Sequence, residues 1–493
     1  VVESDIQDPA ETKTDVGCSL DLDTYHSVAL PPARVIYGID RSGLHGPINY
    51  FLGVLYAFAR IRVGATFPSF TVTVGGTWVE GETATLTFGG VAASKVVVAG
   101  DTTSTIAAHF AYYINAVFTA IWASVSSNVV TITVRSPSDV VAWEMAETSA
   151  SGTLTSSTGG SSGTLGPGTA GIYEIDPAAS PVLAGAARDW NADFYAQVAA
   201  KSWTATTALS VEFTNPPDYA DASPPGQIWS SRYLDNSEAE FEIVPGFNAI
   251  HCAFTADVLV YQKKVALELA AAQNTAGLTP DLQWGEFLWW YNQGTYAEGM
   301  ALYDADTAAA AQTALGRPLY QFHTENDDPS VNAYADANFL RNRLRDHIAA
   351  LRAHVVATYP TAKFQLLWAY NVNRPATEPD PQRLNRYINL PAEFEQKAGS
   401  GLDEFRMEAL NFGAFDHNLD RARRAFQYPY GTLAWAKADV SYNLPVMTPH
   451  GPWAREYLLA RRESIARMVF WAKDHFDLRS EQLPLPVEEG RTL

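Results

Sequence analysis

Two glutamates, Glu286 and Glu408, have the residue type and the sequence context of a catalytic carboxyl pair. Glu286 lies in the apolar segment LQWGEFLWWYN, and Glu408 lies in RMEALNFGAFDHN. Each falls near the C-terminal end of an expected strand, the fourth and the seventh of a series. If those strands form a barrel, their C-terminal ends meet at one mouth. Two carboxyl groups about 5–5.5 Å apart could act there as acid/base and nucleophile in retaining glycoside hydrolysis.

Aromatic residues near these glutamates could form a platform for a sugar ring. They are Trp284, Trp289, Trp290, Trp368 and Tyr370. The same side chains could instead fill a core or an interface, because aromatic residues dominate burial. Hydrolases of this kind usually carry Asn directly before the acid/base, and Gly285 stands there in this chain. Glycan hydrolysis, and glycan or receptor binding without chemistry, therefore remain alternative hypotheses.

The sequence predicts no metal site and no cofactor. The segment His323-Thr-Glu-Asn-Asp-Asp328 has metal-ligating residue types but lacks the spacing of a calcium loop, and its Asp-Pro end is typical of a turn. Neither H-E-x-x-H nor G-x-S-x-G occurs, and no glycine-rich nucleotide motif follows an expected strand. The two cysteines, Cys18 and Cys252, are too few and too far apart in sequence to build a metal site.

The composition bounds the class of protein and its partners. The chain has 493 residues, of which 47% are hydrophobic and 18% charged, so it is long enough for two or three globular domains. The net charge is −20, and no Lys/Arg cluster is dense enough to predict nucleic-acid binding. No apolar run approaches the roughly 20 residues that span a bilayer, and the acidic N-terminus is not a signal peptide. We therefore expect a chain made in a cytoplasm that binds neither nucleic acid nor membrane.

Short apolar runs alternate with helical segments along most of the chain. The expected strands are 34–39, 208–213, 249–254, 282–288, 319–322, 364–369 and 405–411, with an eighth within 433–440. The expected helices are 47–61, 187–201, 256–272, 304–315, 333–358, 391–398, 416–426 and 452–476. Repeated strand–helix units predict a parallel sheet, and their number favours a (β/α)8 TIM barrel over a doubly wound open sheet.

A different pattern interrupts this series after residue 62. Strand-like alternation at 71–74, 83–88 and 95–98 is broken by glycine pairs, and a helical run to about Phe118 and a β-rich run, 129–134, follow. Asp101 is a good N-cap for that helix. This segment therefore predicts a small inserted α+β domain of the ββαβ type. The Gly/Ser/Thr-rich residues 152–171 that follow are expected to be a flexible linker.

These patterns predict six segments. Residues 1–33 are an N-terminal extension, 34–62 start the barrel, and 63–151 are the inserted module. Residues 152–171 are the linker, 172–476 complete the barrel, and 477–493 are a C-terminal tail.

The inserted segment resembles small modules that recur in bacteriophage tail proteins, through GGTWVEGETATLTFGG and VVVAGDTTSTIA. Together with LQWGEFLWWYN and the segment from GMALYDAD to NFLRNRL, the chain resembles phage non-contractile tail sheath proteins, which have a TIM-barrel domain. This resemblance implies a virion structural protein, a tail sheath or tail-decorating subunit, and not an enzyme. Its expected partners are other copies of itself, in a ring or helical lattice, and the tail tube protein. Its expected location is the virion tail.

The amino-acid composition is compatible with a subunit of an assembly. Thirteen Trp, 23 Tyr and 23 Phe supply large, stiff contact areas of the kind that recurring interfaces use. The acidic net charge would keep free subunits apart until their geometry favours docking.

Overall fold

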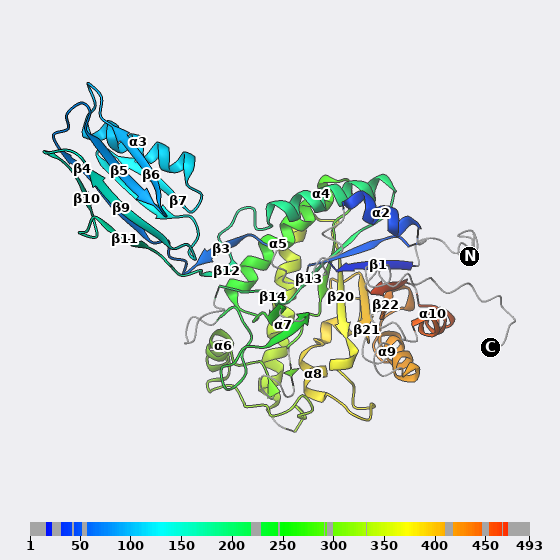
Figure 1. Cartoon of the computed structure of the whole chain (residues 1–493). Helices are drawn as coiled ribbons and strands as arrows, with labels where there is room; N and C mark the ends of the chain where they lie inside the picture. Colours follow the sequence, from blue (N-terminus) through cyan, green and yellow to red (C-terminus); the bar gives the residue numbers. More distant parts are fainter. Residues whose placement is uncertain are drawn as a thin grey trace. The chain divides into compact units, whose positions relative to one another are not determined.

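The computed structural model describes most of the chain between residues 16 and 471. The described ranges are 16–21, 31–41, 44–51, 57–217, 228–244, 247–289, 291–292, 299–331, 333–409, 418–445, 453–465 and 467–471. By its internal contacts the chain divides into two units, shown in Figure 1. The first comprises Val1–Arg60 with Ile175–Leu493, and the second comprises Ile61–Glu174.

The first unit is built on a closed barrel of parallel strands (Figure 1). In order around the barrel these are β1 (Val16–Asp21), β2 (Pro47–Phe51), β13 (Thr206–Ser210), β17 (Asp281–Gly285), β20 (Lys363–Ala369), β21 (Glu404–Glu408), β22 (Val440–Pro445) and β23 (Arg467–Trp471). Every neighbouring pair is parallel, and β1 also pairs with β23. The predicted TIM-barrel fold is confirmed.

Helices cover the outer face of this sheet. They are α2 (Pro32–Arg41), α4 (Gly185–Ala200), α5 (Ala256–Thr275), α6 (Ala305–Leu315), α7 (Tyr334–Thr358), α8 (Arg383–Ile388), α9 (Leu419–Gly431) and α10 (Trp453–Arg462). In α5, Thr255 caps the first turn by accepting a hydrogen bond from the backbone of Val258. The buried residues Val258, Tyr261 and Val265 then recur at helical spacing, so one face of α5 packs on the barrel.

Smaller sheets accompany the barrel. The antiparallel strands β14 (Glu212–Phe213), β16 (Phe247–His251) and β15 (Glu240–Val244) form one, and β18 (Tyr291–Asn292) pairs with β19 (Gly299–Met300). None of the helices in the described ranges is both long and apolar enough to cross a membrane.

The inside of the barrel combines a thin apolar layer with a buried polar network. Ile48, Ala208, Leu367 and Val469, from four different strands, form a separate apolar cluster. Towards the N-terminal ends of the strands, Arg406 is fully buried and donates to Glu404 (2.6 Å), Gln365 (2.8 Å) and Ser441 (3.0 Å). Gln365 also donates to Asp281 at 3.0 Å, so hydrogen bonds join β17, β20, β21 and β22 across the interior.

Three of the predicted barrel strands are wrong. Residues 34–39 belong to helix α2, whose buried Val35, Ile36 and Ile39 lie on one helical face. Residues 249–254 overlap β16, which lies in the small antiparallel sheet. Residues 319–322 form no strand, because side chains bind their backbone: Tyr320 N donates to Asp336 and Phe322 N donates to Tyr303, both at 2.8 Å.

Three barrel strands lie where the sequence predicts other structure. β1 lies inside the predicted N-terminal extension 1–33, β2 inside the predicted helix 47–61, and β23 inside the predicted helix 452–476. The strand predicted within 433–440 is β22, which begins only at Val440. The predicted helix 391–398 is reduced to a 3-10 turn at Ala392–Glu395. The predicted tail 477–493 lies outside the described residues.

The second unit is larger than the predicted ββαβ module. One four-stranded sheet has the order β10 (Gly152–Ser156), β4 (Ser69–Gly76), β8 (Val129–Val134), β7 (Ile121–Ser126). The other has the order β11 (Ser162–Leu165), β9 (Val141–Glu147), β5 (Thr83–Phe88), β6 (Val91–Val96). Helix α3 (Thr103–Val117) shares their apolar core, and Phe70 of the first sheet stacks on Trp143 of the second with 4.4 Å between ring centroids.

Two predictions for this unit are therefore corrected. Residues 152–171, expected to be a linker, contain β10 and β11, because Leu154 and Leu165 are buried in the core. The N-cap of α3 is Thr102 rather than Asp101, and Thr102 forms a reciprocal capping box with Thr105. The chain enters and leaves the unit through β3 (Arg60–Val63) and β12 (Ile172–Ile175), which pair with each other.

Candidate functional site

The two glutamates of the predicted pair lie at the C-terminal mouth of the barrel. β17 ends at Gly285, so Glu286 is the first residue beyond that strand, and Glu408 is the last residue of β21. Only β20 runs between these two strands. The side chains of Glu286 and Glu408 share a hydrogen bond. The structure therefore brings the two carboxyl groups within hydrogen-bonding reach of each other.

Burial and contact give the two carboxyl groups different environments. Desolvation raises the pKa of Glu286 above its usual value, and the hydrogen bond with Glu408 partly offsets that rise. Glu408 is 3% exposed, and its Oε2 accepts a hydrogen bond from Asn443 Nδ2 at 2.9 Å. Two carboxylates in contact repel each other, so a proton shared between them stabilises the pair. Desolvation thus favours the protonated form of Glu286, and Asn443 supplies a donor to the carboxyl group of Glu408.

The backbone at Glu286 adopts a conformation that non-glycine residues seldom take. Its φ is 49°, in the left-handed region. Such a conformation costs on the order of 1–3 kcal/mol and tends to be retained where it aims a side chain at a functional position. Here it follows Gly285 directly and turns the chain at the end of β17, with the Glu286 carboxyl against Glu408.

The strand number of Glu408 corrects the sequence-based prediction. Glu286 follows the fourth strand of the barrel, as expected, but Glu408 lies on the sixth and not the seventh. The difference arises because the predicted strand 319–322 does not exist, so one strand fewer separates the two residues.

The proposed aromatic platform is also corrected. Trp284 and Trp289 are 0% exposed, and Trp368 and Tyr370 are 1% exposed. Trp284 stacks on Phe364, and Trp368 stacks on Tyr428 of helix α9. These four side chains belong to the core and offer no face to a sugar. Trp290 lies outside the described residues.

Strand alternation explains why these aromatics miss the mouth. In β21 the polar residues Glu404, Arg406 and Glu408 alternate with the apolar Phe405 and Met407. The polar set bonds across the barrel interior, whereas the apolar set packs in the main core with the helices. Successive side chains of a strand point to opposite faces. By the same alternation, Trp284 and Trp368 point outwards from the barrel, towards the helices. The alternation of polar and apolar residues in EFRME is the sequence signal that could have predicted this orientation.

The segment from His323 to Asp328 is a turn. Asp327 accepts hydrogen bonds from the backbone of His323 (2.8 Å) and of Thr324 (3.4 Å), and Asp328 accepts from Ser330. Within the described ranges, no group of three or more His, Cys, Asp or Glu side chains is arranged to hold a metal ion.

Two buried groups near the mouth escaped the sequence analysis. Asn443, on β22, lies in register with Glu408 and holds its carboxylate. His251 approaches Glu212 with 3.6 Å between Nε2 and Oε1, and burial lowers the pKa of His251 to about 3. This histidine is therefore neutral at physiological pH. Sequence spacing could not predict either contact, because strand register pairs Asn443 with Glu408 and His251 with Glu212.

A closed barrel of parallel strands wrapped by helices, with polar groups at its C-terminal mouth, defines a TIM-barrel protein. A family model described as the TIM barrel of the non-contractile tail sheath protein matches residues 169–442. The match spans over half of the chain, and the chain belongs to this family. The resemblance predicted from the sequence is confirmed, and it assigns the chain to the structural proteins of the phage tail.

Among the solved structures with detectable likeness are two carbohydrate-active enzymes. The PgaB (BpsB) glycoside hydrolase domain from Bordetella bronchiseptica has a TM-score of 0.38 at 14% identity, covering 58% of this chain and 74% of that one. The α-galactosidase from Lactobacillus brevis has a TM-score of 0.31 at 10% identity, covering 59% of this chain and 31% of that one. At such values nothing about activity follows. A search of curated proteins gave no match.

Proposed function

We propose that this protein is a sheath subunit of a phage tail, in which copies assemble in rings around the tail tube. The family membership of residues 169–442 carries this proposal. The barrel suits such a role, because hydrogen bonds of Arg406 and Gln365 tie four strands together internally. In this role the barrel is a building block, and no reaction is required of its mouth.

Electron microscopy of purified virions, with an antibody against residues 61–174, tests this proposal. Regular labelling along the whole tail is expected, together with rings or a helical lattice in images of the purified protein. An antibody against the tail tube protein serves as the control for tail integrity. Labelling confined to the tail tip, or absence of the protein from intact virions, would contradict a sheath role.

The carboxyl pair favours a second candidate, retaining hydrolysis of a host surface glycan by Glu286 and Glu408. Glu286, with its raised pKa, would be the acid/base, and Glu408 would be the nucleophile. Because the two groups lie within hydrogen-bonding reach of each other, the sugar would have to separate them. The burial of Trp284, Trp289, Trp368 and Tyr370 removes the predicted stacking platform, so a glycan-binding role based on those residues is not proposed.

The test of this second candidate is release of reducing sugar from host surface polysaccharide by the wild type. Glu286→Gln and Glu408→Gln should each lower the rate by at least a hundredfold. Glu393→Gln makes the same substitution at an exposed glutamate and should leave the rate unchanged. No release by the wild type would rule out hydrolysis of that glycan. Sheath formation should be the same in all four proteins.

A further inference from the structure

A pocket lies at the other end of the barrel from the carboxyl pair. It has a volume of ≈ 370 Å³ and is lined by His45, Gly46, Lys201, Ser202, Trp203, Thr204 and Arg467. His45 and Gly46 precede β2, residues 202–204 precede β13, and Arg467 begins β23. All these positions lie at the N-terminal ends of barrel strands, which is the face opposite the catalytic one in TIM barrels.

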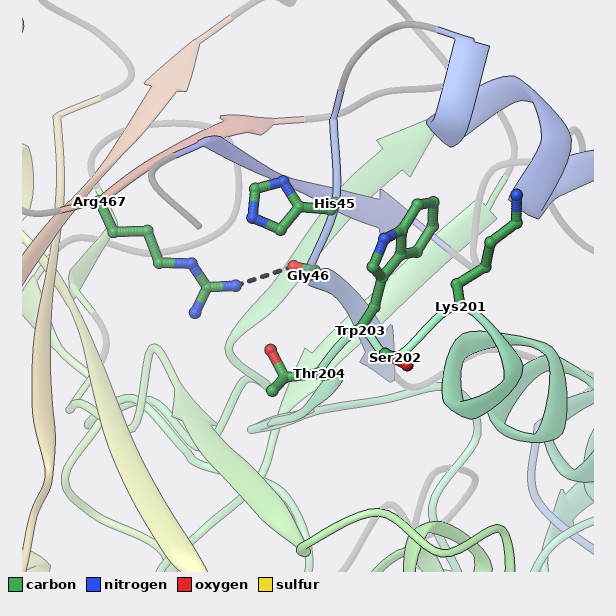
Figure 2. A pocket seen from close by; sticks show the side chains of 7 residues that line it. All are labelled: His45, Gly46, Lys201, Ser202, Trp203, Thr204 and Arg467. Atoms are coloured by element: carbon green, nitrogen blue, oxygen red, sulfur yellow. Dashed lines mark hydrogen bonds between the residues drawn. The ribbon is translucent and has the colours of Figure 1, made fainter. Parts of the chain in front are cut away.

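Figure 2 shows how the side chains are arranged. Arg467 at the start of β23 approaches His45 and Thr204, which precede β2 and β13, and the indole of Trp203 stands on the far side of His45 from Arg467. The ammonium of Lys201 points away towards α2, where it pairs with Asp40 at 2.6 Å. The lining thus contains a guanidinium, an imidazole, two hydroxyl groups and an aromatic wall. None of the lining residues is a carboxylate, although the whole chain has a net charge of −20.

Arg467 is held in place for this pocket. Its Nη2 donates to the carbonyl of Gly46 at 2.8 Å, and its Nη1 lies 3.9 Å from Glu404 Oε2. A guanidinium has five N–H donors, so these contacts leave donor capacity on the pocket side. Gly46 has φ +59°, and a Cβ there would lie 2.8 Å from Nη2 of Arg467. A side chain at this position would therefore displace the guanidinium from the Gly46 carbonyl.

We propose that this pocket binds an oxyanion, a carboxylate or phosphate group, on the guanidinium of Arg467. Thr204 donates its hydroxyl to the same anion, His45 closes one side, and Trp203 packs against the apolar part of the ligand. Arginine is suited to this because its planar donors match both oxygens of such groups. The anion has two sources, a free small molecule or an acidic side chain of another copy. The second source rests on the proposed sheath assembly.

Calorimetric titration of the full chain with inorganic phosphate and with citrate, at low salt, tests for the free anion. We expect saturable binding that Arg467→Gln weakens at least tenfold. Because Arg467 also contacts Glu404, Thr204→Val is the second variant: it leaves that contact intact and should weaken binding severalfold. Arg383→Gln, an exposed arginine elsewhere on the barrel, is the matched control and should bind as the wild type does.

Light scattering tests for the acidic side chain of another copy. If wild-type copies assemble, millimolar citrate should disperse the assemblies and Thr204→Val should form fewer of them, with Arg383→Gln again unchanged. Anion binding without any effect on assembly supports a free ligand. The pocket is no oxyanion site if the wild type binds neither phosphate nor citrate, and if neither added citrate nor the Thr204→Val substitution changes self-association. A wild type that binds anions yet never assembles contradicts the sheath proposal alone.

Discussion

Glu456 is a carboxyl group enclosed between helix α10 and the barrel. It is fully buried, and one of its oxygens accepts a hydrogen bond from the hydroxyl of Tyr442 on β22. Burial raises the pKa of Glu456 to about 8, although the bond from Tyr442 acts in the opposite direction. The folded protein therefore holds this group as a neutral acid at pH values where the unfolded chain is ionised.

This difference predicts a pH-dependent loss of stability. Because the pKa of Glu456 is raised on folding, its favourable contribution is complete below about pH 4.5 and is lost as the pH rises to about 8. Glu456→Gln keeps a neutral group and should remove this decline, on the order of 3–5 kcal/mol between pH 4.5 and pH 9. Urea denaturation at several pH values measures it, with Glu393→Gln as control. If the free energy of unfolding fell equally with pH in the wild type and in Glu456→Gln, the raised pKa of Glu456 would be contradicted.

Arg406 is the central cation inside the barrel. Burial would raise the pKa of Glu404, but Arg406 and Arg467 hold it below its usual value. Arg406→Met removes a cationic partner of the buried Glu404 carboxylate and should lower the free energy of unfolding by about 3–5 kcal/mol. The double variant with Glu404→Gln should recover part of that loss. Chemical denaturation measures both, and an equal loss in the single and double variants would show that the pair is not coupled.

At the scale of the element, Asn115 shields an edge strand of the second unit. β7 is the last strand of its sheet, and the Asn115 amide on α3 donates to the carbonyl of Ala123 (2.7 Å) and accepts from its N–H (2.8 Å). Arg135 covers another β7 carbonyl, that of Ile121, at 2.8 Å. Unpaired edges invite pairing with other chains, so these contacts protect against aggregation.

Asn115→Ala should therefore have two effects. Two lost hydrogen bonds should destabilise the unit by about 1–2 kcal/mol. The uncovered β7 edge should also increase self-association, seen as faster growth of light scattering on warming. Tyr112→Phe, on the same helix at a side chain that is 75% exposed, is the control. An unchanged melting temperature and unchanged scattering would show that Asn115 neither stabilises the unit nor prevents self-association through β7.

Elements with strong periodicity could be predicted from the sequence, and short ones could not. α5 and α7 are long enough for their buried faces to repeat several times, and both were located within a few residues. β1, with the sequence VGCSLD, has too few apolar residues to resemble a barrel strand. The run in α2 is too short to distinguish helix from strand, and β10 and β11 look like linker because Gly, Ser and Thr dominate them.

For the candidate site, the sequence placed Glu286 and Glu408 at strand ends but could not give their contact. The hydrogen bond between them depends on the left-handed backbone at Glu286 and on barrel closure. Asn443 joins them through strand register, which spacing along the chain does not reveal. The aromatics were misplaced because the parity of a strand decides which face a side chain meets.

At the scale of the whole molecule, we propose that residues 61–174 form an independent domain inserted into the barrel. Their core is a separate apolar cluster, and β3 and β12, which carry the chain in and out, pair with each other. A fragment of these residues should fold alone and unfold cooperatively on heating. The chain with a short Gly/Ser linker in their place should keep a folded barrel. Circular dichroism measures both, and an unfolded fragment would contradict the proposal.

The barrel closes by pairing its first strand with its last, with Val16 beside Met468. During synthesis on the ribosome, β1 emerges first of the eight barrel strands, and its partner β23 emerges only after the six others have been translated. Until then the nascent sheet has two unpaired edge strands. Strands of neighbouring nascent chains on the same messenger RNA could pair with these edges. A host cell making many copies at once should therefore depend on chaperones, which cover these edges until translation reaches the final strand.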